Sequence, residues 1–168
     1  MKIAIFSDLH DDGGNLKLFL DYCKHQKIKN LICCGDLANQ ESLENLATNF
    51  KGKIFMVGGN ADLFDESETN IYPNIVFQPK ILSFSLGALK IIAIHKPKEL
   101  REELAKRSEK YDFAFHGHTH RPIISQNEKL ITANPGSLNG PDYQASFAIL
   151  DCATKKIELK ILAHTKNP

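Results

Sequence analysis

The first sixty residues alternate between short apolar runs and amphipathic stretches, and this alternation restricts the fold more than any other feature of the chain. The apolar runs at residues 2–6, 31–34 and 54–57 have the length and composition of buried strands. Between them, apolar residues recur at helical spacing in residues 16–25 and 43–50. A β-α-β-α-β order of this kind predicts a parallel sheet with right-handed crossovers.

The rest of the chain is dominated by short strands. A charged stretch at residues 97–109 begins with proline and contains Leu100 and Leu104, which predicts one exposed helix. Strands are predicted at residues 75–77, 81–86, 89–94, 111–115, 123–124, 129–132, 145–150 and 156–162. The most economical arrangement is two packed sheets with helices outside, in one domain spanning residues 1–168.

Potential metal ligands follow five of the predicted strands directly. The strand ends carry Asp8 with His10, Asp36, Asn60, His95, and His118 with His120. Ligands of open α/β sheets bind beyond the carboxyl ends of the strands, so these side chains are predicted to converge on one site. Any single coincidence is weak, because Asp and Asn are ordinary turn residues. Five together favour a binding site over a set of turns.

The last strand end is a histidine cluster. His116, His118 and His120 alternate with other residues, and Gly117 can adopt backbone angles that would bring the last two histidines into one pocket. Carboxylate, amide and imidazole ligands without a thiolate suit Mn²⁺, Zn²⁺, Fe or Ni²⁺. Seven ligands exceed the needs of one ion, so two ions sharing one carboxylate are predicted. Such a pair clamps the attacking and leaving oxygens of a phosphoryl displacement.

These motifs resemble those of the calcineurin-like metallophosphoesterase superfamily, in the same order across nearly the whole chain. The resemblance implies an α/β fold, a four-layer αββα sandwich of two mixed sheets flanked by helices. The compact length and the residues 134–137, Asn-Pro-Gly-Ser, are similar to the small bacterial and archaeal phosphodiesterase branch. That branch includes the retromer subunit of vacuolar sorting. The matching segments are Asp8-Leu9-His10, Gly35-Asp36, Gly59-Asn60-Ala61-Asp62, His95 and Gly117-His118-Thr119-His120.

The resemblance also implies a role for each matching residue. Asp8, His10 and His120 would hold a first metal ion; Asn60, His95 and His118 would hold a second; Asp36 would bridge both. A hydroxide bridging the ions would attack phosphorus in line. The implied catalytic set is Asp36, Asn60, His95 and His118.

The implied activity is hydrolysis of phosphate diesters with two divalent metal ions. Mn²⁺ is the first choice, with Zn²⁺, Ni²⁺ or Fe as alternatives, and no organic cofactor is expected. Two other functions remain open at this point. One is a phosphomonoesterase acting on small phosphates or nucleotides, and the other is a non-catalytic binding module similar to the retromer subunit.

The chain departs from the family pattern at two positions. Most of the superfamily has a histidine after the asparagine, where it helps to protonate the leaving oxygen, and this chain has Ala61. His95 is followed by Lys96 and Pro97, where many relatives have glycine and a further histidine. The protonating role is therefore expected to be vacant at Ala61, and whatever the further histidine does in relatives must be done differently here.

Several residues beside the proposed ligands have two interpretations. Asp62 is predicted to accept backbone hydrogen bonds that anchor the Asn60 loop, rather than to bind metal. His116 either orients a ligand or packs at a strand end, with equal weight. Lys96 and Arg121 follow proposed ligands and either contact substrate phosphate or remain solvated, and solvation is favoured for Lys96.

Composition limits the partners. Lys and Arg number 21 against 20 Asp and Glu, a net charge of +1, which argues against a broad nucleic-acid or membrane patch. No apolar run approaches membrane-spanning length, and the N-terminal run is too short for a signal peptide. The four cysteines are predicted to be reduced and buried. We therefore expect a cytoplasmic protein with a small phosphate-ester substrate, and the sequence leaves homo-oligomers open.

Overall fold

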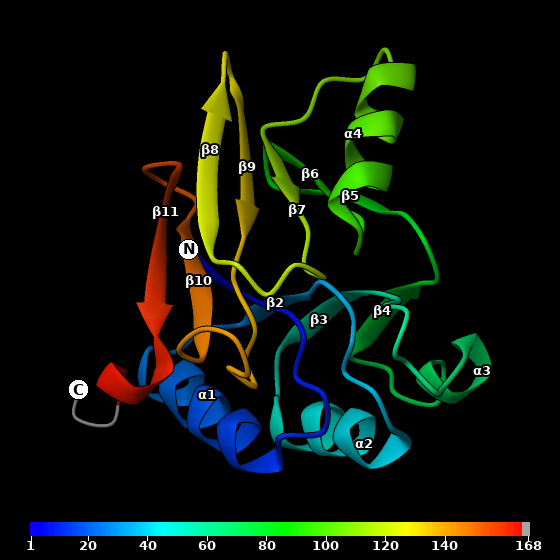
Figure 1. The fold of residues 1–168 in the computed structure, drawn as a ribbon, viewed down its shortest axis with the longest axis vertical. Helices are drawn as coiled ribbons and strands as arrows, with labels where there is room; N and C mark the ends of the chain where they lie inside the picture. Colours follow the sequence, from blue (N-terminus) through cyan, green and yellow to red (C-terminus); the bar gives the residue numbers. More distant parts are fainter. Residues whose placement is uncertain (166–168) are drawn as a thin grey trace.

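The computed structural model describes residues 1–165, which form two β-sheets and their covering helices (Figure 1). The helices are α1 (Gly13–His25), α2 (Gln40–Asn49), α3 (Glu66–Thr69), α4 (Pro97–Lys106) and the 3₁₀ helix η1 (Leu162–Thr165). The strands are β1 (Lys2–Phe6), β2 (Asn30–Cys33), β3 (Lys53–Val57), β4 (Ile75–Gln78), β5 (Leu82–Leu86), β6 (Leu89–Ala93), β7 (Phe113–Phe115), β8 (Ile123–Asn127), β9 (Leu130–Asn134), β10 (Ser146–Asp151) and β11 (Lys156–Ile161).

Both sheets are mixed. The six-stranded sheet has the order β11-β10-β1-β2-β3-β4; β1 to β4 run parallel, and β10 and β11 are antiparallel additions. The five-stranded sheet has the order β5-β6-β7-β9-β8, in which β6, β7 and β9 are parallel and both edge strands are antiparallel. The predicted parallel β-α-β-α-β unit and the two mixed sheets are thus confirmed.

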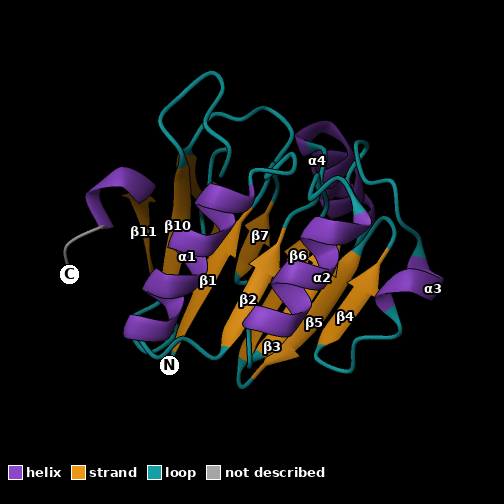
Figure 2. Cartoon of the chain, turned by 90° about the horizontal axis from the view of Figure 1, so that it is seen from below, coloured by secondary structure: helices purple, strands orange, loops and turns teal. Residues whose placement is uncertain are grey.

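Three apolar layers hold four structural layers together. α1 and α2 cover the outer face of the six-stranded sheet (Figure 2), where Phe19 of α1 packs against Phe6 and Phe147. The two sheets pack face to face, and Phe55 stacks on Phe84 across them with ring centroids 4.0 Å apart. Leu100 of α4 packs in a third cluster on the outer face of the five-stranded sheet. The four-layer αββα sandwich expected from the family resemblance is therefore present.

Some helix boundaries differ from the predictions. The predictions follow the spacing of apolar residues, whereas local hydrogen bonds determine where a helix begins and ends. α1 begins at Gly13, three residues before the first apolar position, since the Asp12 side chain accepts a hydrogen bond from the Asn15 amide and caps the helix. α3 was not predicted; it is one turn made by a capping box at Asp65. α4 ends at Lys106 rather than at residue 109.

All four cysteines are free, as predicted. Cys152 is half-buried rather than buried, because it lies in the turn between β10 and β11. An open groove of about 780 Å³ lies between α1 and α2, and none of the predicted ligands lines it. Within residues 1–165, no helix is long and apolar enough to cross a lipid bilayer.

Parallel strands bring the predicted ligands to one edge of the molecule. The loops that follow β1 and β2 are joined by backbone hydrogen bonds from the amide of Asp8 to the Gly35 carbonyl and from the amide of His10 to the Asp36 carbonyl. On the other sheet, the Gly117 amide donates to the His95 carbonyl. These bonds fix the loops of each sheet relative to one another.

Candidate metal centre

The structure brings all seven predicted ligand residues together, in two adjacent groups. The first group is Asp8, His10 and His120, and the second is Asp36, His95 and His118 with Asn60 beside them. Within each set of three, one ligand atom per residue lies within 4.8 Å of the others. Asn60 joins the second group through its Oδ1, 3.2 Å from the His95 Nε2.

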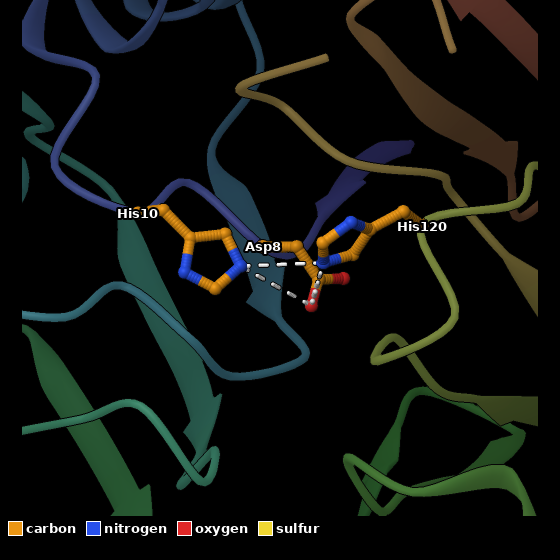
Figure 3. A group of neighbouring side chains, drawn as sticks. All are labelled: Asp8, His10 and His120. Atoms are coloured by element: carbon orange, nitrogen blue, oxygen red, sulfur yellow. Dashed lines mark hydrogen bonds and ion pairs between the residues drawn. The ribbon is translucent and has the colours of Figure 1, made fainter. Parts of the chain in front are cut away.

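In the first group, two imidazole rings and a buried carboxylate face one another (Figure 3). The His10 Nε2 lies 3.3 Å from the His120 Nε2. The Asp8 Oδ1 lies 3.5 Å from the same His120 nitrogen and 4.0 Å from that of His10. Three potential donor atoms therefore surround one small space.

In the second group, the Asp36 carboxylate faces both sets of ligands. Its Oδ2 lies 3.3 Å from the His95 Nε2 and 3.9 Å from the His10 Nε2 of the first group. Its Oδ1 accepts a hydrogen bond from the Ala61 amide at 2.8 Å, which fixes the plane of the carboxylate. One oxygen of Asp36 is thus directed at the space between the groups.

The hydrogen bonds of the outer histidine nitrogens show that these groups fit metal ions. The His95 Nδ1 lies 2.8 Å from the Cys34 carbonyl oxygen, and the His120 Nδ1 lies 2.9 Å from a carboxylate oxygen of Asp142. Both oxygens only accept, so each Nδ1 carries a proton, and in the neutral form of each ring the Nε2 lone pair points inward. There the lone pairs meet those of Asp8 and Asp36. A divalent cation in each space would satisfy them together.

Burial and hydrogen bonding act in opposite directions on the acidic ligands. Burial raises the pKa of Asp8 above its usual value, against the smaller effect of the Ser7 hydroxyl. Burial also acts to raise the pKa of Asp36, but hydrogen bonds from His95 and the Ala61 amide outweigh it, and the pKa is lowered. Burial acts to lower the pKa of His95, and the Asp36 carboxylate raises it overall. A bound cation would offset the cost of keeping Asp8 ionised.

Most of the ligands lie in a strained backbone conformation. Asp8, His10, Asp36, His118 and His120 all have φ between 45° and 68°, in the left-handed region that non-glycine residues rarely adopt. Such conformations cost of order 1–3 kcal/mol each in general, and they cluster at functional sites where the surrounding structure imposes them. Here the loops turn sharply after each strand so that the side chains point inward.

A glycine in the histidine cluster is required by close packing. A Cβ at position 117 would lie 1.8 Å from the Ser7 Oγ and 2.6 Å from the Asp8 Oδ2. The cluster therefore approaches the first strand end closely enough for the His118 amide to donate to the Asp8 carboxylate at 3.1 Å. This contact orients Asp8.

The contacts of three residues beside the ligands favour one of their two interpretations. The predicted role of Asp62 is confirmed, because its carboxylate accepts hydrogen bonds from the amides of Ala38 (2.9 Å) and Gly59 (2.7 Å). The buried His116 bonds to the Gly117 carbonyl, and burial lowers its pKa, which favours packing at the strand end. Lys96 lies 3.9 Å from Glu99 at the surface, as expected of a solvated charge.

The sequence favours a structural turn over residues 134–140, with a role in shaping the pocket as the alternative, and the structure places this segment in contact with the site. The buried Asn134 side chain donates to the Gly117 carbonyl and to the Thr119 hydroxyl, both at 3.0 Å. The Ser137 hydroxyl donates to the Asp8 carbonyl at 2.8 Å. In the sequence this segment has the composition of a turn, and nothing in it indicates a contact with residues more than a hundred positions away. The contact of Asp142 with His120 could not be predicted for the same reason, since an Asp after a Pro is typical of a turn.

Comparisons with known proteins agree on the family and the fold. A sequence profile of the calcineurin-like phosphoesterase superfamily domain matches residues 1–155. The chain is 28% identical over 152 residues to phosphodiesterase MJ0936 of Methanocaldococcus jannaschii, an alignment that covers 83% of this chain and 86% of that protein.

Solved structures resemble the chain over nearly its whole length. A novel archaeal phosphodiesterase has a TM-score of 0.85 at 24% identity, covering 96% of this chain and 99% of that one. The phosphoesterase Yfce from E. coli has a TM-score of 0.69 at 18% identity, covering 96% and 100%. Zinc-bound Vps29 from Entamoeba histolytica has a TM-score of 0.71 at 18% identity, covering 95% and 97%. At these identities the structural matches establish the fold.

Proposed function

This chain belongs to the calcineurin-like phosphoesterase superfamily and is a metal-dependent phosphoesterase, and we propose that it hydrolyses phosphate diesters with two divalent metal ions, preferably Mn²⁺. One observation carries the proposal: the Asp36 Oδ2 faces an imidazole nitrogen in each of two adjacent ligand groups, at 3.3 and 3.9 Å. The family and its archaeal phosphodiesterase relative support the same reaction class.

The proposed ligand sets are those of the family resemblance. Asp8, His10 and His120 would hold one ion, Asn60, His95 and His118 the other, and Asp36 would bind both. When bound, two divalent ions would neutralise charge on the phosphate oxygens and acidify the attacking water. With no thiolate in the set, the oxygen and imidazole donors suit Mn²⁺, with Zn²⁺, Ni²⁺ or Fe as alternatives.

The side chains of this chain contribute orientation and fixed charge. The Cys34 carbonyl fixes the His95 ring, and the Ala61 amide fixes Asp36, so neither group has to reorganise when substrate arrives. The four residues Asp36, Asn60, His95 and His118 would surround the reacting phosphate. Asp62 holds the loop that carries Asn60.

We predict that an activated diester is a better substrate than the matching monoester. A monoester dianion is favoured where several cationic side chains surround the phosphate. Here the basic residues that directly follow ligands are Lys96, which faces Glu99, and Arg121. One charge-assisted hydrogen bond is worth about 1.5–3 kcal/mol. A monoester that lacks one such contact with a cationic side chain should therefore have a kcat/KM roughly tenfold or more below that of the diester. The measurement compares bis(p-nitrophenyl) phosphate with p-nitrophenyl phosphate, after reloading metal-free protein with Mn²⁺, Zn²⁺ or Ni²⁺.

The result separates the three functions. A higher kcat/KM for the monoester would replace the proposal with a phosphomonoesterase. Protein that binds two ions but hydrolyses neither ester, with any of the metals, would favour a binding module of the kind suggested by the fold shared with Vps29. A metal-free sample serves as the control for non-enzymatic hydrolysis and for contaminating phosphatase.

A second prediction concerns the position where most of the superfamily has a histidine. Ala61 has no side-chain proton to give to a departing alkoxide, so the rate should fall steeply as the pKa of the leaving group rises. We expect Ala61→His to flatten this dependence. The gain for alkyl leaving groups should be about ten- to a hundredfold, within the range of positioned general acids. It is measured with a series of diesters that differ only in the leaving alcohol.

Ala61→Gln is the matched control, because glutamine has a similar size but no titratable proton. An equal change of slope in both variants would attribute the effect to a moved Asp36, whose carboxylate bonds to the amide of this residue. An unchanged slope in an Ala61→His protein that keeps both metal ions would show that a missing acid does not limit the reaction.

A further inference from the structure

A carboxylate outside the predicted ligand set contacts the first group. The Oδ2 of Asp142 lies 2.9 Å from the Nδ1 of His120, on the side of the ring opposite to Asp8 and His10. Asp142 lies in the loop before β10, 22 residues after His120, and its side chain is 64% exposed. Neither the sequence pattern nor the family motifs assign it a function.

The loop that carries Asp142 is attached to the first strand end. The Leu138 amide donates to the Ser7 carbonyl at 2.9 Å, and the Asn139 amide to the Asp8 carbonyl at 3.3 Å. The Gly140 amide then donates to the Ser137 hydroxyl at 3.1 Å, with Gly140 itself in the left-handed region at φ 76°. Asp142 is therefore held close to the segment that carries Asp8, where it can reach His120.

His95 and His120 differ in the group that orients their rings. His95 in the second group is 4% exposed, and a backbone carbonyl, that of Cys34, accepts its outer N–H. His120 is 21% exposed and donates to the side chain of Asp142. A carboxylate on the outer nitrogen of a metal-binding histidine fixes the tautomer and makes the inner nitrogen a better ligand. For His95 this function needs no side chain, and for His120 it depends on one.

We propose that Asp142 is a positioning residue for the first metal site, which orients His120 so that its Nε2 faces Asp8 and His10. The proposal rests on the proposed function only in that the two groups bind metal; it does not require any particular substrate. It implies that a substitution at position 142 weakens the binding of one of the two metal ions and leaves the binding of the other unchanged.

The state of the His120 ring in metal-free protein provides the first test. Long-range ¹H–¹⁵N correlation spectra, recorded where the ring is neutral, should show the proton on Nδ1 in the wild type. In Asp142→Ala the ring should give a mixture of tautomers, and in the control Asp21→Ala, an exposed change on α1, it should remain as in the wild type. A His120 spectrum that is the same in Asp142→Ala and in the wild type would overturn the proposal.

Metal titration provides the second test, and it needs no turnover. Competition with a chromogenic chelator should show that Asp142→Ala binds one equivalent of Mn²⁺ about 10- to 100-fold more weakly, the usual cost of removing such a partner. The second equivalent should be unchanged. Asp142→Asn should lose less Mn²⁺ affinity than Asp142→Ala, because its amide oxygen can still accept the hydrogen bond from His120. Asp142→Glu, which keeps a carboxylate, should also lose less affinity than Asp142→Ala. Equal weakening of both ions, or of neither, would contradict the proposal.

These outcomes are distinguishable from a failure of the proposed function. Wild-type protein that binds metal but hydrolyses no phosphate ester would disprove the enzymatic proposal and leave both tests of Asp142 intact. Normal hydrolysis by the wild type, together with a His120 tautomer in Asp142→Ala that is the same as in the wild type, would support the enzymatic proposal and disprove the role of Asp142.

Discussion

Asp36→Ala should remove both metal ions from the protein and lower kcat/KM by at least roughly 10²–10³-fold, the scale on which removing one preorganised catalytic group acts. The reason is geometric, because the Asp36 Oδ2 faces the His95 Nε2 at 3.3 Å and the His10 Nε2 at 3.9 Å. The other proposed ligands each belong to one group. Metal content is measured on purified protein after chelation and reloading.

Two further variants separate bridging from folding. Asp36→Asn keeps an oxygen for the Ala61 amide, so it should fold like the wild type and still lose metal through its missing charge. His120→Ala should lose mainly one ion, since its Nε2 faces Asp8 and His10, which both belong to the first group. If folded Asp36→Ala retained two full equivalents of metal, Asp36 would not be the bridging ligand.

The fold was predictable because its hydrophobic pattern is simple. The buried strands β1, β2 and β3 are short apolar runs with no competing helical period, and the helices between them show their apolar face in the sequence. α3 could not be predicted in this way, because one turn that buries only Thr69 leaves no period to detect. The early start of α1 depends on a cap at Asp12, which looked like part of a loop.

The ligand side chains of the site were predictable, but the backbone conformation and the hydrogen bonds that hold them in place were not. Ligands follow strands, and parallel strands share an edge, so convergence follows from topology. The left-handed backbone of His10 and Asp36 is imposed by tertiary contacts, since neither residue favours it by itself. Asn134 at the end of β9 and Asp142 in the loop before β10 contact the histidine cluster, and no periodic pattern in the sequence places these two positions beside it.

We expect Gly59→Ala to destabilise the protein by about 1–3 kcal/mol or more, the usual cost of overpacking, and to reduce metal binding by the second group. A Cβ at position 59 would lie 2.2 Å from the backbone nitrogen of Asp36 and 2.1 Å from its Oδ1. A flexible side chain could move away, but a backbone atom cannot, so the two loops must separate. That separation would break the Ala61–Asp36 hydrogen bond, which lies in the same contact.

Gly13→Ala is the matched control for this prediction. A Cβ at position 13 would meet no atom within 4 Å, and alanine in the first turn of α1 should leave stability unchanged or raise it by up to about 1 kcal/mol. Denaturant unfolding of both variants should be measured on metal-free protein, because a bound ion would add its own binding free energy to the folded state. The loss should therefore be specific to Gly59 and present without metal. If Gly59→Ala unfolded like Gly13→Ala and still bound two ions, the close approach of the β2 and β3 loops would not be required for the site.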